Sequence, residues 1–220
     1  MIAYLLSSLR EWRRARMSRS VGYSAALLAA AALAGPLQPL LLALAGVAVF
    51  ALSGWAEGNS PGSKGGEGLD PAAFPAGTWA VVAGRLLSAL AVWLALLLAF
   101  SPLFAASAIA WGLSREVMLS CLACWLCAFL LAASAGFCSK LLFPGSEGLI
   151  GLCVFLLWLF SSFFAERLRA SNPFVQAWSL LKLEGGKVEA AGLLADAAGA
   201  AALLAASALA ISRRRRQRDA

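Results

Sequence analysis

The sequence contains no histidine and few charged residues. Among its 220 residues only 13% are charged, whereas soluble globular domains average about 25%. Histidine is the usual general base at neutral pH, and the 11 carboxylates form no paired acid–base arrangement. These absences argue against a soluble enzyme, and we expect neither catalytic residues nor a cofactor.

Hydrophobic residues dominate instead, at 61% of the chain. Apolar runs that approach or exceed the ~20 residues needed to span a bilayer recur along it. This pattern predicts an all-α fold: a polytopic membrane protein with about six transmembrane helices, preceded by an amphipathic interfacial helix. We find no internal repeat and no separate soluble domain.

The N-terminal segment 1–20 predicts the interfacial helix. Ile2, Leu5, Leu6 and Leu9 recur at helical spacing, and arginines occupy the rest of the circumference. Such a helix lies in the membrane surface with its apolar face in the lipid. A signal peptide is the alternative, because a basic start precedes an alanine-rich run; the length and amphipathicity of the segment favour the interfacial helix.

Six spans are predicted within residues 21–211. The apolar stretch 21–55 is too long for one span, and the segment GPLQP at 35–39 divides it into two short ones. The four spans that follow are expected at 80–111, 116–139, 147–165 and 190–211. Pro102 is expected to kink the first of these four, which is overlong.

The distribution of positive charge supports six spans over five. With a cytoplasmic N-terminus, six spans place 13 of the 18 Lys and Arg residues on the cytoplasmic side. Merging residues 21–55 into one span leaves 10 there and moves the basic tail, 212–220, outside. Cytoplasmic loops are enriched in Lys and Arg, so we expect both termini in the cytoplasm. Beside membrane spans, the basic clusters favour anionic lipid as a partner over nucleic acid.

Five cysteines lie in or beside apolar runs, and three form a C-x-x-C-x-x-C motif at Cys121, Cys124 and Cys127. The motif suggests a metal or cluster site. On a helix, however, a spacing of three residues distributes the thiols over roughly 120° of the surface. With no histidine or nearby carboxylate, the sequence predicts that these cysteines act as small hydrophobic residues and bind no metal.

Asp196 is the one carboxylate placed inside a predicted span. Ionisable groups in the middle of a membrane often mark ion-driven transport. Asp196, however, lies only a turn or two inside the last span. The sequence therefore favours a solvated or helix-capping carboxylate at the membrane interface.

The longest polar connection, about 56–79, reads AEGNSPGSKGGEGLDPAAFPAGTW and is glycine-rich. A phosphate-binding loop needs Gly-Lys followed by Ser or Thr, after a strand. Lys64 is preceded by Ser63 and followed by Gly65, and no strand precedes it. The connection is not predicted to bind nucleotide.

Two motifs carry a resemblance to a known family. The connection between the second and third spans has Glu57, then Gly-Leu-Asp-Pro at 68–71, then Ala-Gly-Arg-Leu-Leu at 83–87. Asn-Pro-Phe at 172–174 and Gly-Gly-Lys-Val-Glu at 185–189 precede the last span. With six spans and a basic amphipathic helix, the chain resembles permease subunits of ABC-2 type exporters, particularly the gliding-motility-associated branch. Arg85 replaces that family's usual lysine, and the SPGSKGGEG insert is unusually rich in glycine.

The resemblance implies an export permease of the bacterial cytoplasmic (inner) membrane, working as a dimer with a second copy or a paralogue. It also implies a separate cytoplasmic ABC ATPase that drives the helices through a coupling connection at about 56–79. The residues expected to make this contact are Glu57, Glu67, Leu69, Asp70 and Phe74. The alternatives are an ordinary flexible connector at this position, a haem-export permease, a membrane scaffold without a transport cycle, and a small membrane enzyme.

Overall fold

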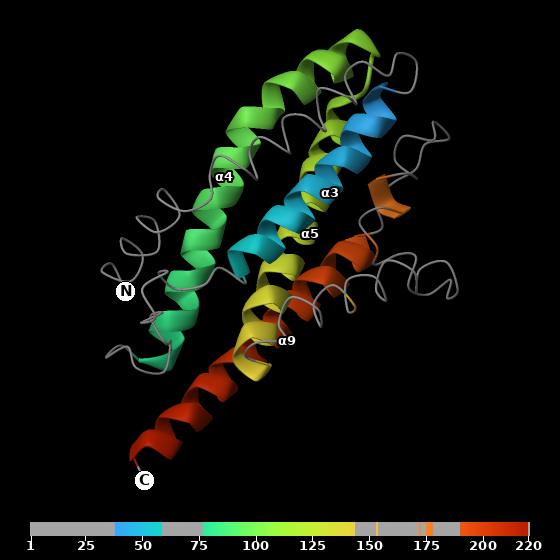
Figure 1. Cartoon of the computed structure of the whole chain (residues 1–220). Helices are drawn as coiled ribbons and strands as arrows, with labels where there is room; N and C mark the ends of the chain where they lie inside the picture. Colours follow the sequence, from blue (N-terminus) through green and yellow to red (C-terminus); the bar gives the residue numbers. More distant parts are fainter. Residues whose placement is uncertain are drawn as a thin grey trace.

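The computed structural model describes residues 38–58, 77–143, 153, 172, 175–177 and 190–219. Within these ranges the elements are helices: α3 (Gln38–Gly58), α4 (Thr78–Ala110), α5 (Arg115–Leu142) and α9 (Ala190–Asp219). The helix α5 packs most extensively against α3 and next against α9, while α4 contacts all three (Figure 1). For the described part of the chain, the prediction of an all-α fold is therefore confirmed.

Three of these helices are long and apolar enough to cross a membrane: α4, α5 and the part of α9 from Ala191 to Gln217. They indicate a membrane protein, as the sequence predicted. The apolar part of α3, Leu41–Ala56, is shorter than a full span. The interfacial helix expected at 1–20 and the first predicted span lie outside the described residues, as does 147–165 apart from Cys153.

The helix boundaries follow local sequence signals. The helix α3 begins at Gln38, inside the Gly-Pro-Leu-Gln-Pro segment that was expected to break the apolar run. Gly112, at φ 66°, ends α4 in the left-handed region that favours glycine. The side chain of Ser114 then accepts a hydrogen bond from the Val117 amide (3.3 Å) and caps α5. A tight turn therefore joins two antiparallel helices.

Two helices extend into segments that the sequence analysis named separately. The basic tail, expected as a separate segment from 212, is helical and continuous with α9 as far as Asp219. Helix-favouring arginines follow the alanine-rich run without a breaker, so the helix continues. The coupling connection is also shorter than expected, because α3 includes residues 57 and 58 and α4 begins at Thr78.

The helices α3 and α5 approach closely because two glycines of α3 face α5. A Cβ atom at Gly46 would overlap the Trp125 ring, and one at Gly54 would overlap the Phe129 carbonyl oxygen. The indole N–H of Trp125 donates a hydrogen bond to the Ala43 carbonyl (3.0 Å) at the same contact. Small residues that allow backbones to approach are typical of helix pairs in membranes.

Aromatic side chains from three helices fill the core beside this contact. The ring of Phe50 in α3 stacks on Trp125 of α5, with centroids 5.3 Å apart. From α4, Phe104 packs against Trp125 at 4.9 Å and Phe100 packs edge-on against Phe50 at 6.3 Å. Such pairs contribute about 0.5–1.5 kcal/mol beyond the area they bury, so this cluster ties α4 to the α3–α5 pair.

The outer surface of α4 is apolar. Leu98 and Ile109 are each 75% exposed. Exposure of such large apolar side chains is unfavourable in water and favourable in lipid. Tryptophans near its two ends, Trp79 and Trp111, are exposed as well, and interfacial tryptophans commonly mark where a helix meets the headgroups. At 33 residues the helix is about 50 Å long, so we expect it to tilt or to extend beyond the hydrocarbon core.

Candidate functional site

The helix ends of α4, α5 and α9 meet at one end of the bundle, where basic side chains connect them. A guanidinium nitrogen of Arg214, near the end of α9, donates a hydrogen bond to the Leu141 carbonyl at the end of α5. The neighbouring Arg215 donates to the Thr78 hydroxyl at the start of α4 (3.5 Å). Cations stabilise the carbonyl end of a helix, so the arginines of α9 hold this end of the bundle together.

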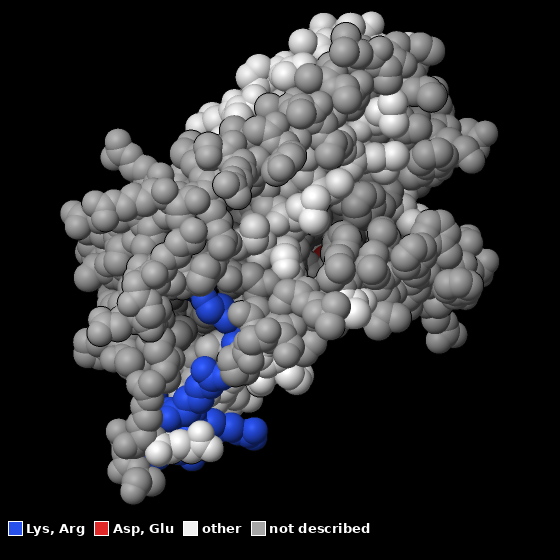
Figure 2. Space-filling model, in the orientation of Figure 1, with Lys and Arg blue, Asp and Glu red and all other residues white. Residues whose placement is uncertain are grey.

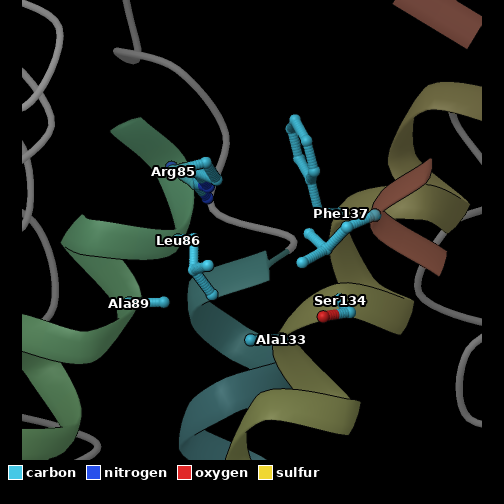
Figure 3. A pocket seen from close by; sticks show the side chains of 7 residues that line it. Arg85, Leu86, Ala89, Ala133, Ser134 and Phe137 are labelled. Carbon is cyan, nitrogen blue, oxygen red and sulfur yellow. The ribbon is translucent and has the colours of Figure 1, made fainter. Parts of the chain in front are cut away.

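Arg85 adds a further positive charge near this end. Its side chain lines a pocket between α4 and α5 with Leu86, Ser134 and Phe137 (Figure 3), and Leu204 of α9 completes the lining. The guanidinium lies 5.9 Å from the centre of the Phe137 ring, within the range of a cation–π contact. The guanidinium thus lies among largely apolar side chains, where the ring supplies a favourable electrostatic partner.

Basic side chains gather at this end of the molecule. Figure 2 shows Lys and Arg atoms gathered toward the end of the molecule where α9 terminates. Arg213 and Arg216 are exposed there, and Lys140 lies in the last turn of α5. We call this region, from Arg85 and Lys140 to Arg213–Arg216, the basic end. Its charge fits anionic groups such as lipid phosphates.

The basic end also receives the expected coupling connection. Gly46 faces Trp125 and Gly54 faces Phe129 further along α5, so α3 and α5 run in the same direction (Figure 1). The helix α4 starts at the basic end, where Thr78 contacts Arg215. The connection between α3 and α4 therefore enters α4 at the basic end.

The structure places one of the five expected coupling residues. Glu57 belongs to the last turn of α3 rather than to the connection. Glu67, Leu69, Asp70 and Phe74 lie outside the described residues, so their role remains a prediction.

The cysteines of the C-x-x-C-x-x-C motif face different neighbours. Cys121 and Cys124 are fully buried, and the thiol of Cys124 donates to the side-chain oxygen of Gln176 at 3.4 Å. The thiol of Cys127 is 3.9 Å from the Leu193 carbonyl of α9. No three His, Cys, Asp or Glu side chains gather as a metal site in the described residues. The motif lies along the interface of α5 with its neighbours.

Replacing Cys121, Cys124 and Cys127 together by alanine is expected to leave membrane insertion and complex assembly intact. Each change removes one sulfur, which is buried at Cys121 and Cys124 and partly buried at Cys127, and costs about 1 kcal/mol or less, as for other small core truncations. Size-exclusion chromatography measures the assembly of the triple variant, and melting curves in detergent measure its stability. Stoichiometric zinc or iron in the wild type, lost from the triple variant in elemental analysis, would show that the motif binds metal.

The sequence favoured a solvated or helix-capping role for Asp196, and this prediction is wrong. It lies in the second turn of α9 but is only 4% exposed. Cys124 and Cys127 of α5 lie near enough for the charge of Asp196 to act on their thiols. Position along the span suggested an interfacial group, whereas Asp196 lies on the side of α9 that faces α5 and is buried. Gln176 contacts Cys124 in the same region. The sequence did not predict this contact, because nothing but its polarity distinguishes Gln176.

Comparisons with known proteins give no relative: no family model, curated protein or solved structure matches the chain.

Proposed function

We propose that this chain is the membrane-spanning permease subunit of an ATP-driven ABC-type exporter. The observation that carries the proposal is the basic end, where Arg85 of α4, Lys140 of α5 and the arginines of α9 gather beside the entry of the 59–77 connection. Arginine enrichment is the mark of a cytoplasmic face, and a permease must meet its ATPase on that face. The export function, the ATPase partner and the dimer are proposed from the family resemblance of the sequence.

In this account the membrane domain contains no hydrolytic machinery of its own. The 59–77 connection docks on a separate cytoplasmic ATPase, and closure of the ATPase pair is transmitted through α4 to the helices packed against it. Two copies, or this chain and a paralogue, enclose the exported molecule in the bacterial cytoplasmic membrane. The basic end holds anionic lipid around the contact.

Both termini are expected in the cytoplasm, with six spans in total. A reporter that is active only inside the cell should give signal when fused after Ala220. A reporter that is active only outside should give signal when inserted after Gly185, before α9. The reason is that α9 is long and apolar enough to cross the membrane, and the arginines at its end favour the cytoplasmic side.

The same fusions include the control, since each reporter is tested at both positions. An external location of the residue 220 fusion would contradict the orientation on which the proposal depends. It would also place the basic end away from any cytoplasmic ATPase, and a membrane scaffold would then become the better description.

A further inference from the structure

Asp196 is a buried carboxyl group in an interface between helices. Its side chain is 4% exposed, and its Oδ2 atom has no hydrogen-bond partner among the residues that the structure describes. The residue lies five positions inside a stretch of α9 that is apolar enough to cross a membrane. Burying an ionised carboxylate without a partner costs many kcal/mol in a medium of low polarity. The negative charge of Asp196 must therefore be neutralised by a group or ion bound to it.

None of the described groups that face Asp196 supplies a cation. From α5, the titratable groups nearest to it are the thiols of Cys124 and Cys127. The side chain of Gln176, which accepts from Cys124, is neutral. On α9 itself, residues 191–212 include no other charged side chain. The immediate surroundings in the described region are therefore uncharged.

The basic residues of the described helices lie far along their axes. At 1.5 Å per residue, Arg115 is about 14 Å from Cys124 along α5 and Arg213 is about 25 Å from Asp196 along α9. Arg85 packs on Phe137, which is about 15 Å beyond Cys127 on α5. Each distance exceeds that of a salt bridge several times over, so these cations do not pair with the carboxylate.

We propose that Asp196 is a proton-binding site of the membrane domain, occupied by a proton when α5 and α9 are packed together. A proton needs no additional space, whereas a metal ion or an ammonium group would have to displace side chains around a residue that is almost fully covered. The protonated carboxyl is neutral and fits the uncharged surroundings.

Proton binding and helix packing are linked by this arrangement. The ionised form of Asp196 is stable only where water or a cation reaches it, so we expect ionisation to favour a state in which α9 packs less closely against α5. Protonation therefore favours the packed state, and loss of the proton favours an opened one. This inference does not depend on an ATPase partner, so it can fail or succeed independently of the proposed function.

The test is labelling of the full-length chain in native membranes with dicyclohexylcarbodiimide, an apolar electrophile to which protonated carboxyl groups add. Peptide mass spectrometry should find a stable adduct on Asp196. The yield should fall about tenfold for each further pH unit once the carboxyl begins to ionise. Glu116, an exposed carboxylate in the first turn of α5, is the control. It should react with a water-soluble carbodiimide instead.

A second measurement does not rely on reagent access. The infrared spectrum of the wild type should contain the carbonyl band of a protonated carboxylic acid, and Asp196→Asn should lack it. Absence of both the adduct and the band at neutral pH would overturn the proposal. Protection of Asp196 by sodium or potassium ions at constant pH would assign the site to a metal cation and would overturn it as well.

Discussion

Gly54→Ala is expected to destabilise the membrane domain, although alanine is ordinarily the better helix former. The added Cβ would overlap the carbonyl oxygen of Phe129. A backbone atom cannot move aside as a flexible side chain can, so α3 must shift away from α5. Overpacking of this kind costs about 1–3 kcal/mol. The melting temperature in detergent should fall by about 2–4 °C for each kcal/mol.

Gly199→Ala is the matched control, because it makes the same change inside another helix. A Cβ atom there would meet only the side chain of Leu131, at 3.4 Å, which is an ordinary contact. Its melting temperature should equal or exceed that of the wild type. Equal stability of the two alanine variants would show that α3 and α5 do not approach as closely as the structure has them.

Under the proposed function, the double replacement of Leu69 and Phe74 by alanine is expected to weaken the association of this chain with a cytoplasmic ATPase. Docking contacts concentrate their energy in a few apolar anchors, each of which costs about 1–2 kcal/mol or more when truncated. Losing two anchors should weaken association by about 30-fold or more, since 1.4 kcal/mol corresponds to a factor of ten. The loss of association is measured by co-purification with the ATPase and by coupled ATP hydrolysis.

The control for that variant is Leu98→Ala combined with Ile109→Ala. These two side chains are also apolar, and they are exposed on α4 rather than in the connection. We expect this control to retain the ATPase. If the variant at 69 and 74 retains it equally well and is expressed normally, the coupling role belongs to another segment and the connection is only a linker.

Helix positions were largely predictable because they depend on local signals. Apolar length predicted α4 and α5 to within a few residues, and the Gly-Pro break predicted the start of α3. The end of α9 was not predicted, because a change from apolar to basic residues marks the end of the hydrocarbon and does not stop a helix. Composition alone cannot separate these two boundaries.

Contacts between distant segments were not predictable in the same way. The burial of Asp196 depends on which face of α9 meets α5, and the weakly amphipathic alanine-rich sequence does not define that face. The bond from Cys124 to Gln176 joins residues 52 positions apart, and no spacing pattern indicates it. The opposition of Gly54 to Phe129 is likewise a property of two packed helices rather than of either sequence.

The central claim is that this chain transports with the help of a separate ATPase. Its most direct test is to purify the tagged full-length chain from its native membrane in mild detergent and to assay ATP hydrolysis with and without the proteins that accompany it. The account predicts that a cytoplasmic ABC ATPase accompanies the chain in equal amount, that this complex hydrolyses ATP, and that the isolated chain does not. Purification without any ATPase, or ATP hydrolysis by the isolated chain, would contradict it.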